Sequence, residues 1–422
     1  MSTLTITEAS CADDYDPDSM PVEKARAFIH QFLQPVRGTL RVPVRDALGR
    51  IVAEDVLSPV NVPSHRNSAM DGWALRGADL ASGAETTLTE IGASFAGKPF
   101  DGRVGAGQCV RIMTGGVVPE GADTVVMQER AKANGKSVTF GGVNRTGQNV
   151  REAGEDLKAG SVALRRGRIV RPAELGLLAS LGVGEVPVYR PLRVAFFSTG
   201  DELRSIGSTL GEGEIYDSNR YTLHGMLTRL GCELLDMGVV RDDPAALERA
   251  FSEAAEVADV VVTSGGVSVG EADFVKSMLG NLGEVVFWKI AMKPGRPLAY
   301  GKIRGAHFFG LPGNPVSVMV TFYQFVRDAL LVLMGADPVM PVPTFTATCT
   351  ERLKKAPGRT EFQRGVLARG SDGRLEVRPT GEQGSGILKS MSDANCFIIL
   401  GDSTGNVEPG ATVEVQLLEG IV

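Results

Sequence analysis

The sequence predicts a multidomain protein that combines an α/β domain with two β-rich domains. Between residues 188 and 337, patterns typical of buried strands alternate with helical patterns, as in a parallel sheet covered by helices. Before and after this region, short apolar–polar alternations lie between closely spaced turn residues, as in small β domains. A chain of 422 residues has room for about two to four such domains.

The overall composition excludes several classes of protein. Hydrophobic residues make up 43% of the chain, which is normal for a globular protein with sizeable cores. The formal charge is −6 and there is no long basic run, so neither nucleic acid nor a membrane surface is an expected partner. The acidic first twenty residues do not resemble a signal peptide, and no apolar run approaches the roughly 18 residues of a membrane span. We therefore expect a cytoplasmic protein.

The cysteine and histidine residues form neither a disulfide framework nor a zinc-binding pattern. The 5 cysteines are far apart without a C-x-x-C pair, and the 4 histidines are equally scattered. A metal bound by this chain is therefore expected to be a hard ion with oxygen ligands, such as Mg²⁺.

The first predicted elements are a helix and a discontinuous linker domain. Residues 1–38 contain an acidic tail and a helical apolar pattern over 21–33, which we expect to pack on the α/β domain. Segments 39–57 and 157–187 flank the first β region, and the second contains a predicted helix at 172–181. Pairing between these two flanks would make them one domain.

Residues 58–156 are predicted to form a small inserted β domain. Asp71 stands in the phrase S-A-M-D-G, and Thr114 precedes a glycine pair at the end of a predicted strand. Both patterns are also common in tight turns. From the residues alone, a turn and a binding role stay open for Asp71 and Thr114.

The α/β domain, residues 188–337, contains strands and helices in regular alternation. Strands are expected at residues 192–197, 232–240, 259–262, 285–288 and 306–310. Helices are expected at residues 218–230, 244–254 and 315–334, and a further one ends near residue 279. Potential caps precede two of these helices, namely Asp217, Ser218 and Asn219, and then Asp243 with Pro244.

Four loops that are rich in acidic residues or glycine follow these strands. They contain Glu202; Asp242; Thr263, Ser264, Gly265 and Gly266 with Glu271 and Asp273; and Gly310 to Pro315. Paired glycines let backbone N–H groups approach an anion, and the carboxylates could hold a cation or cap a helix. Each loop alone could be a turn, but ligands of such sheets bind at the carboxyl ends of the strands. Four such loops at one edge therefore indicate a ligand site.

Basic residues and a second β domain follow. Lys289 and Lys293 would be surface charges in isolation, but beside an anion-binding loop they more plausibly neutralise the anion. Residues 338–422 return to alternating patterns, which predict a β barrel or sandwich. Spacing alone assigns the stretches around Arg364 and Ser385 to turns.

Taken in order, the motifs resemble those of molybdopterin molybdenumtransferases, the MoeA-type family that includes the gephyrin E domain. The resemblance covers nearly the whole chain beyond the acidic tail and rests on S-A-M-D-G, M-T-G-G, S-T-G-D-E-L, T-S-G-G-V-S-V-G-E-A-D, K-P-G-R-P and G-L-P-G-N-P-V-S. It implies an elongated subunit of four parts, with a MogA-like α/β domain and a C-terminal β barrel. It also implies a homodimer, whose active-site cleft lies between the α/β domain of one subunit and parts of the other.

The activity implied by this resemblance is Mg²⁺-dependent insertion of molybdenum from molybdate into adenylylated molybdopterin, which releases AMP and molybdenum cofactor. This reaction cleaves a phosphoanhydride and brings two anions together, so a metal and cationic side chains would offset charge in the transition state. Dithiolene sulfurs, and not protein thiols, are expected to receive the metal. Transient contacts with the molybdopterin adenylyltransferase and with acceptor molybdoenzymes are also implied.

The resemblance also gives roles to individual residues. Glu202, Asp242 and Asp273 look like cleft carboxylates and magnesium ligands, and Asp71 like a further catalytic residue from the inserted domain. The expected substrate-binding residues are Thr114, Thr263, Ser264, Gly265, Gly266, Lys289, Lys293, Pro312, Gly313, Asn314, Pro315, Arg364 and Ser385.

Three alternatives remain open at this point. A molybdopterin adenylyltransferase shares the α/β module and its T-S-G-G loop, although the two flanking β regions favour metal insertion. A non-catalytic scaffold is a second alternative, against which the set of cleft acids and lysines argues. The sequence does not distinguish molybdate from tungstate as the metal source.

Overall fold

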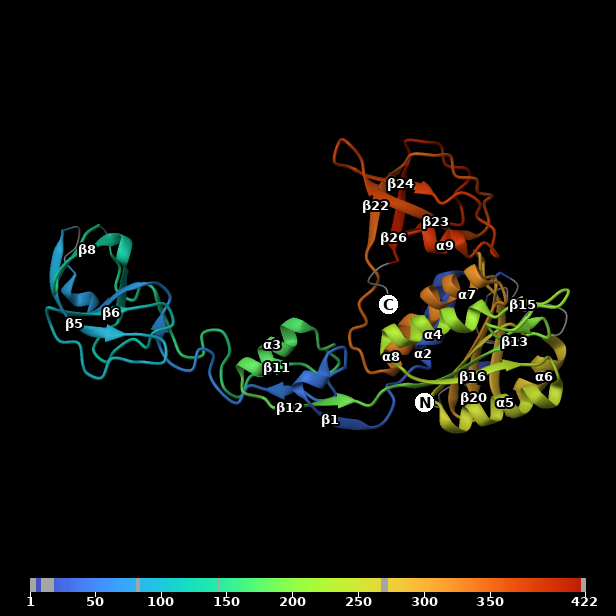
Figure 1. Ribbon diagram of the computed structural model, residues 1–422, viewed down its shortest axis with the longest axis horizontal. Coiled ribbons are helices and arrows are strands. Elements are labelled where there is room, and N and C mark those ends of the chain that lie inside the picture. Colours follow the sequence, from blue (N-terminus) through green and yellow to red (C-terminus); the bar gives the residue numbers. More distant parts are fainter. Residues whose placement is uncertain (1–4, 9–18, 81–83, 143, 267–271, 419–422) are drawn as a thin grey trace.

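The structure is a computed structural model that describes residues 5–8, 19–80, 84–142, 144–266 and 272–418. The chain is elongated (Figure 1). The α/β domain and the C-terminal barrel lie together at one end, the inserted β domain lies at the other, and a narrow unit connects them (Figure 1). The predicted combination of an α/β domain with two β domains is confirmed.

The inserted β domain is built on a six-stranded sheet with the order β7-β4-β6-β5-β9-β8. Its strands are β4 (Gly72–Leu75), β5 (Thr86–Ser94), β6 (Gln108–Ile112), β7 (Thr124–Met127), β8 (Ala131–Asn134) and β9 (Ser137–Phe140). Apolar clusters cover both faces, with Trp73 and Phe140 in one cluster and Val110 and Val125 in the other. The sheet therefore has its own core, independent of the α/β domain.

The connecting unit consists of two short antiparallel pairs and one helix. Strand β1 (Thr39–Pro43) pairs with β12 (Glu185–Tyr189), and β2 (Val56–Leu57) pairs with β11 (Val162–Leu164). Helix α3 (Pro172–Ser180) lies between β11 and β12 in the sequence, after the inserted domain. The two flanks of the inserted domain thus pair with each other, as a discontinuous domain requires. The exact domain limits stay predictions.

The α/β domain contains a six-stranded sheet with the order β16-β13-β17-β21-β20-β18. The strands are β13 (Arg193–Thr199), β16 (Glu233–Val240), β17 (Val260–Ser264), β18 (Gly283–Lys289), β20 (Pro297–Ile303) and β21 (Ala306–Leu311). Its helices are α4 (Ser218–Leu230), α5 (Pro244–Val257) and α6 (Ala272–Leu282). Phe196 and Phe309 belong to the core on one face of the sheet, and Phe197 and Phe308 to the core on the other.

The expectation of a parallel sheet is wrong for one of the six strands, β20. Strands β16, β13, β17 and β21 are mutually parallel, but β20 is antiparallel to both β21 and β18. The cause is a two-residue turn between β20 and β21, in which Arg304 and Gly305 have φ of 48° and 98°. Such a turn can join only antiparallel neighbours.

The predicted helix caps are present in the α/β domain. The Asp217 side chain accepts a hydrogen bond from the Arg220 N–H, and Gly231 ends α4 with φ of 81°. The Asp243 side chain accepts from the Ala246 N–H, and Pro244 is the first residue of α5. The ends of both helices are therefore determined by local residues.

The last helix of the α/β domain is long and apolar. It runs through α7 (Pro315–Thr321), a π-helical turn (Phe322–Val326) and α8 (Arg327–Leu333). By length and composition this helix could cross a membrane, but 83% of its most apolar window is buried inside the protein. Helix α2 (Val22–Gln31) packs beside it, where Arg26 Nε donates to the Gln324 carbonyl oxygen at 2.9 Å. Burial in the core accounts for its apolar composition.

The C-terminal domain is a closed five-stranded barrel. Its strands are β22 (Thr344–Cys349), β23 (Thr360–Arg369), β24 (Leu375–Pro379), β25 (Cys396–Leu400) and β26 (Thr412–Leu417), with the short helix α9 (Lys389–Asp393). Strand β25 pairs with both β26 and β23, which closes the barrel. Strand β19 (Met292–Lys293) leaves the α/β domain and pairs with β23, which fixes the barrel against that domain.

Glu174 stabilises the start of α3 in the connecting unit. It accepts hydrogen bonds from the Arg171 backbone at 3.0 Å and from the Arg171 and Arg168 side chains at 3.0 and 2.7 Å. Its side chain is only 6% exposed. The bond from the Arg171 side chain is the largest influence, and together these bonds outweigh burial and lower the Glu174 pKa to about 2.

We predict that Glu174→Gln lowers the local free energy of unfolding around α3 by about 2 kcal/mol at pH 7, because the charged partner of Arg168 and Arg171 is lost. The effect is limited to this size because both arginines are exposed and solvent partly screens the ion pairs. The stabilisation is complete above the ordinary carboxyl pKa of 4.5 and is lost as the pH falls toward 2. Hydrogen exchange of the α3 amides between pH 7 and pH 3 measures it. Glu185→Gln, on the exposed part of β12, is the control, and a variant effect that did not change with pH would contradict the prediction.

Candidate active site

The glycine loop after β17 brings two neighbouring strands together at the carboxyl edge of the sheet. Thr263 and Ser264 end β17 and are buried, and Gly265 and Gly266 follow with φ of 92° and 68°. A Cβ atom on Gly265 would lie 2.6 Å from the carbonyl oxygen of Thr199, at the end of β13. Only glycine fits this approach, because the backbone is both left-handed and too close for a side chain.

The Gly265 amide is not available to an anion, contrary to the expectation that both glycines would donate. Its N–H donates to the Leu311 carbonyl oxygen at 3.1 Å. This bond continues the pairing of β17 with β21 by one residue and directs the loop toward Pro312–Pro315. The glycine pair therefore positions the loop first, and leaves Gly266 as the amide to consider for ligand binding.

Asn219 joins the two central loops of the site. Its Nδ2 donates to Ser264 Oγ at 2.7 Å and to the Gly313 carbonyl oxygen at 2.6 Å, and the residue is 8% exposed. The sequence predicted Asn219 only as a possible helix cap, whereas Asp217 is the residue that caps α4. The signal for a site role was its place at the start of a helix that follows a strand end.

Three buried polar atoms at this edge have no hydrogen-bond partner within the part of the chain that the structure describes. They are Thr199 Oγ1, Asp217 Oδ2 and Asn219 Oδ1. A Cβ atom on Gly266 would lie 3.0 Å from Thr199 Oγ1, so Thr199 borders the glycine loop. Leaving such groups unbonded costs free energy, and a ligand or ordered water that bonded them would be stabilised.

The expected carboxylates lie at the same edge as far as they are described. Glu202 follows β13 and Asp242 follows β16, and both residues are exposed. The Glu202 carboxylate lies against Gly200, where a Cβ atom would come within 2.5 Å of Glu202 Oε2. Asp273 is in the first turn of α6, but its side chain, like Glu271, lies outside the described part of the structure.

Carboxylate oxygens are the donors that a hard cation prefers. Among the described side chains, no group of three or more histidine, cysteine, aspartate or glutamate residues converges on one point. Glu202 and Asp242 nevertheless supply two oxygen donors from adjacent strand ends. This donor chemistry fits Mg²⁺.

Lys289 and Lys293 lie at the ends of β18 and β19. Strand β18 runs in the same direction as β21, since both are antiparallel to β20, so Lys289 also ends at the carboxyl edge. Lys293 lies in β19, with Nζ 3.5 Å from Glu361 Oε1 of the barrel. Glu361 Oε2 also accepts from Gln363 Nε2 at 2.9 Å. Lys293 therefore belongs to the junction of the two domains, with 48% of its side chain exposed.

The barrel contributes a loop to the same junction. The Ser385 carbonyl oxygen accepts from the Val316 N–H at 3.1 Å, which places this loop on the start of α7 directly after Pro312–Pro315. Arg364 is 1% exposed, and its guanidinium donates to Ser390 Oγ at 3.0 Å and to the Gly384 carbonyl oxygen at 2.9 Å. Burial lowers the pKa of Arg364 to about 10. In this chain Arg364 supports the Ser385 loop from inside the barrel.

Asp71 and Thr114 lie together, but far from the other site residues of the same chain. Asp71 Oδ1 accepts from the Thr114 backbone N–H at 2.7 Å and from its hydroxyl at 2.8 Å. These bonds, the backbone one first, lower the pKa of Asp71 and keep it charged at neutral pH. Both residues are in the inserted domain, at the opposite end of the chain from the α/β domain (Figure 1). A single chain does not bring all the predicted residues together.

We predict that Asn219→Ala destabilises the α/β domain by about 1–3 kcal/mol, because Ser264 Oγ and the Gly313 carbonyl oxygen lose a buried donor. Urea unfolding followed by the fluorescence of Trp288 measures this in a Trp73→Phe background. Asn281→Ala, at an exposed position on α6, is the matched control and should change stability by less than about 0.5 kcal/mol. Equal effects of the two substitutions would show that the bridge is not important.

Three family descriptions match successive parts of the sequence. The MoeA N-terminal region (domain I and II) matches residues 20–182, the probable molybdopterin binding domain matches residues 195–332, and the MoeA C-terminal region (domain IV) matches residues 346–418. The order and spacing of these regions agree with the order of domains in the structure.

Individual relatives match over nearly the full length. The chain is 46% identical over 398 residues to the molybdopterin molybdenumtransferase of Haemophilus influenzae, which covers 94% of this chain and 98% of the relative. It is 35% identical over 412 residues to the protein of the same name from Bacillus subtilis, with 94% of each chain covered. A crystal structure of the molybdopterin biosynthesis moeA protein of Pyrococcus horikoshii superposes with a TM-score of 0.82 at 29% identity, covering 95% of this chain and 100% of that one.

Sequence identity, domain order and overall fold thus agree along the same length of chain. The matched regions contain the sequence motifs of the site. They also contain the carboxyl edge of the α/β sheet and the Ser385 loop of the barrel. The protein belongs to the MoeA-type family of molybdopterin molybdenumtransferases.

Proposed function

We propose that this enzyme of molybdenum cofactor biosynthesis inserts molybdenum from molybdate into adenylylated molybdopterin with the help of Mg²⁺, and releases AMP and molybdenum cofactor. The main support for the proposal is that Asn219 hydrogen-bonds to both the glycine loop, at Ser264, and the loop after β21, at Gly313. Carboxylates and lysines lie at the same edge of the sheet. A substrate with phosphates, a metal-binding end and a large ring system needs these groups in one place.

The phosphate-bearing part of the substrate would lie against the glycine loop. Gly266 and the start of α7 both lie at this edge, and the positive end of a helix dipole favours an anion. The unbonded Thr199 hydroxyl is available to a phosphate oxygen, in agreement with its buried and partnerless state among the described residues. Lys289 and Lys293 would neutralise charge beside it.

Glu202, Asp242 and Asp273 would hold the magnesium ion. When bound, the ion would offset phosphate charge as the phosphoanhydride is cleaved and AMP leaves. The residues of the chain then contribute by orientation: carboxylates at the ends of separate strands fix the reacting groups relative to the glycine loop. No covalent intermediate on the protein is required.

Molybdate would enter at the barrel side of the cleft, near Lys293 and the Ser385 loop. Arg364 acts in this proposal as a positioning residue for that loop, since its guanidinium is bonded inside the barrel. Protein thiols are poor candidates to receive the metal. Burial raises the pKa values of Cys109, Cys232 and Cys396 to about 12, so these thiols are protonated at neutral pH. The dithiolene sulfurs of the substrate are the expected acceptors.

A second copy of the chain would complete the site with Asp71 and Thr114. Within one chain these residues are separated from the α/β domain by the length of the connecting unit (Figure 1). In a symmetric dimer each inserted domain can reach the α/β domain of the partner, so two equivalent sites form. This arrangement would use every predicted site residue.

The direct test is an assay of the purified chain with adenylylated molybdopterin, molybdate and Mg²⁺. AMP release should depend on molybdate and should proceed together with formation of cofactor that activates a molybdenum-free apoenzyme. Glu202→Gln should slow the reaction by about 100-fold, as loss of one charge-stabilising group does in comparable sites. Glu233→Gln, at the opposite end of β16, is the matched control and should retain full activity.

Two results would contradict this proposal. The first is release of AMP that does not require molybdate. The second is formation of adenylylated molybdopterin from ATP and molybdopterin, which would assign the chain to the preceding adenylylation step. Substituting tungstate for molybdate in the same assay defines the preference for the metal oxyanion.

The shared site has its own prediction. Asp71→Asn and Glu202→Gln chains, each with about 1% of the wild-type activity or less when alone, should reach about one quarter of the wild-type activity when they are co-expressed in equal amounts. About half of the dimers are then mixed, and one of the two sites in each mixed dimer contains both native residues. Purification through two different affinity tags isolates the mixed dimer. If that dimer stays inactive, Asp71 does not act in the site of the partner subunit.

A further inference from the structure

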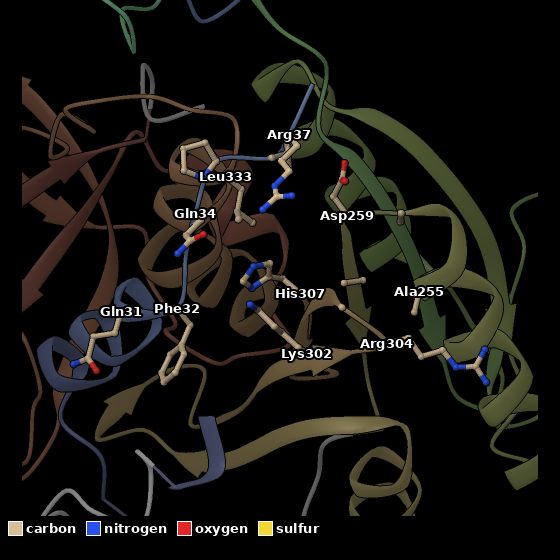
Figure 2. Close-up of a pocket in the computed structure, with 15 residues that line it drawn as sticks. Gln31, Phe32, Gln34, Arg37, Ala255, Asp259, Lys302, Arg304, His307 and Leu333 are labelled. Carbon is tan, nitrogen blue, oxygen red and sulfur yellow. The ribbon is translucent and has the colours of Figure 1, made fainter. Parts of the chain in front are cut away.

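A pocket of about 830 Å³ opens at the amino-terminal edge of the α/β sheet, opposite to the candidate active site. It lies between the segment that follows α2, the end of α5, and the hairpin of β20 and β21 (Figure 2). Asp259 precedes β17 and His307 is the second residue of β21, so the pocket is at the start of the parallel strands. No residue of the predicted active site lines it.

The charges in this pocket are not balanced. Arg304 is paired with Glu256 at 2.6 Å, and Asp259 is paired with Arg190 through two bonds of 2.6 and 2.7 Å. Arg37 and Lys302 also line the pocket, but neither side chain has an ion pair or hydrogen bond within the residues that the structure describes. The pocket therefore contains two positive charges without a carboxylate partner.

These two cations lie on either side of a buried histidine. Figure 2 shows the side chains of Arg37, His307 and Lys302 projecting into the same space. His307 is 8% exposed, and its Nδ1 lies 3.4 Å from the Tyr300 hydroxyl, which leaves Nε2 on the side of the pocket. Burial, with a smaller effect of Lys302, lowers the pKa of His307 to about 4, so the ring is neutral at physiological pH. The Tyr300 hydroxyl also donates to the Ile29 carbonyl oxygen at 3.5 Å, so its single proton is shared between two acceptors.

The helix ends at this edge do not account for the two cations. Helices α5 and α8 end here, and helix C-termini carry a partial negative charge that cations can stabilise. The last carbonyl of α8 already has a backbone partner, since the Val36 N–H donates to the Leu333 carbonyl oxygen at 2.8 Å. Two full positive charges also exceed the roughly half charge of each helix end.

We propose that this pocket is a second ligand site, which binds a phosphate monoester attached to a small ring. The phosphate would lie between Arg37, Lys302 and His307, and the ring would contact apolar lining residues such as Phe32 and Leu333. A volume of about 830 Å³ is within the range of small-molecule sites. Its position at the opposite sheet edge makes it independent of the proposed transferase reaction.

Phenyl phosphate is a suitable probe, because it combines a dianionic phosphate with an apolar ring. In isothermal titration calorimetry with the full-length protein, Arg37→Gln and Lys302→Gln should each weaken its binding by about 10- to 100-fold. Arg304→Gln is the matched control from the same hairpin, and it should change the affinity by less than about twofold because Arg304 is already paired with Glu256. Circular dichroism establishes that each variant is folded, and Lys302→Arg should retain most of the affinity.

Several outcomes would overturn this proposal. Absence of phenyl phosphate binding to the wild-type protein would mean that the pocket is not a site for a phosphate monoester. Binding that is lost in Asn219→Ala but retained in Arg37→Gln would place the probe at the active site instead. Equal affinities for phenyl phosphate and inorganic phosphate would exclude a monoester with a recognised ring, whereas a weaker inorganic phosphate supports the proposal.

Discussion

The close approach of Gly265 to the Thr199 carbonyl oxygen is the constraint on which the site depends. It holds the ends of β13 and β17 together, and the next hydrogen bond, from Gly265 to Leu311, aligns β21 with them. The loop after β21 then starts α7, onto which the barrel places its Ser385 loop. One backbone contact that requires glycine therefore sets the relative positions of three loops and two domains.

The two edges of the α/β sheet would bind an anion through different groups. At the carboxyl edge, the positive ends of the helix dipoles favour an anion, and the lysines add further positive charge. At the amino edge the helix ends are weakly negative, and any anion there must be held by side chains alone. This difference explains why the pocket around Lys302 is lined by Arg37 and His307 as well, whereas the glycine loop is built from small residues.

Local signals determined how much could be predicted from the sequence. The ends of α4 and α5 were predictable because Asp217 and Asp243 cap them directly. Strand β20 was missed, since Pro297 and Gly301 interrupt the strand pattern, and its antiparallel direction could not be predicted because periodicity does not encode strand direction. Asn219 was missed as a bridge for a related reason: its partners lie 45 and 94 residues away in the sequence. The pairing of Asp71 with Thr114 spans 43 residues and was equally invisible.

The connecting unit is small, yet it alone holds the inserted domain in position relative to the α/β domain (Figure 1). Two-stranded sheets are marginal in water, so β1–β12 and β2–β11 depend on a small core that includes Val52, Leu178 and Val186. Helix α3 supplies part of that core, and Glu174 holds the start of α3. In the proposed dimer, the position of Asp71 relative to the partner site is transmitted through this unit alone. The stability of a segment without any site residue would then control the geometry of the shared site.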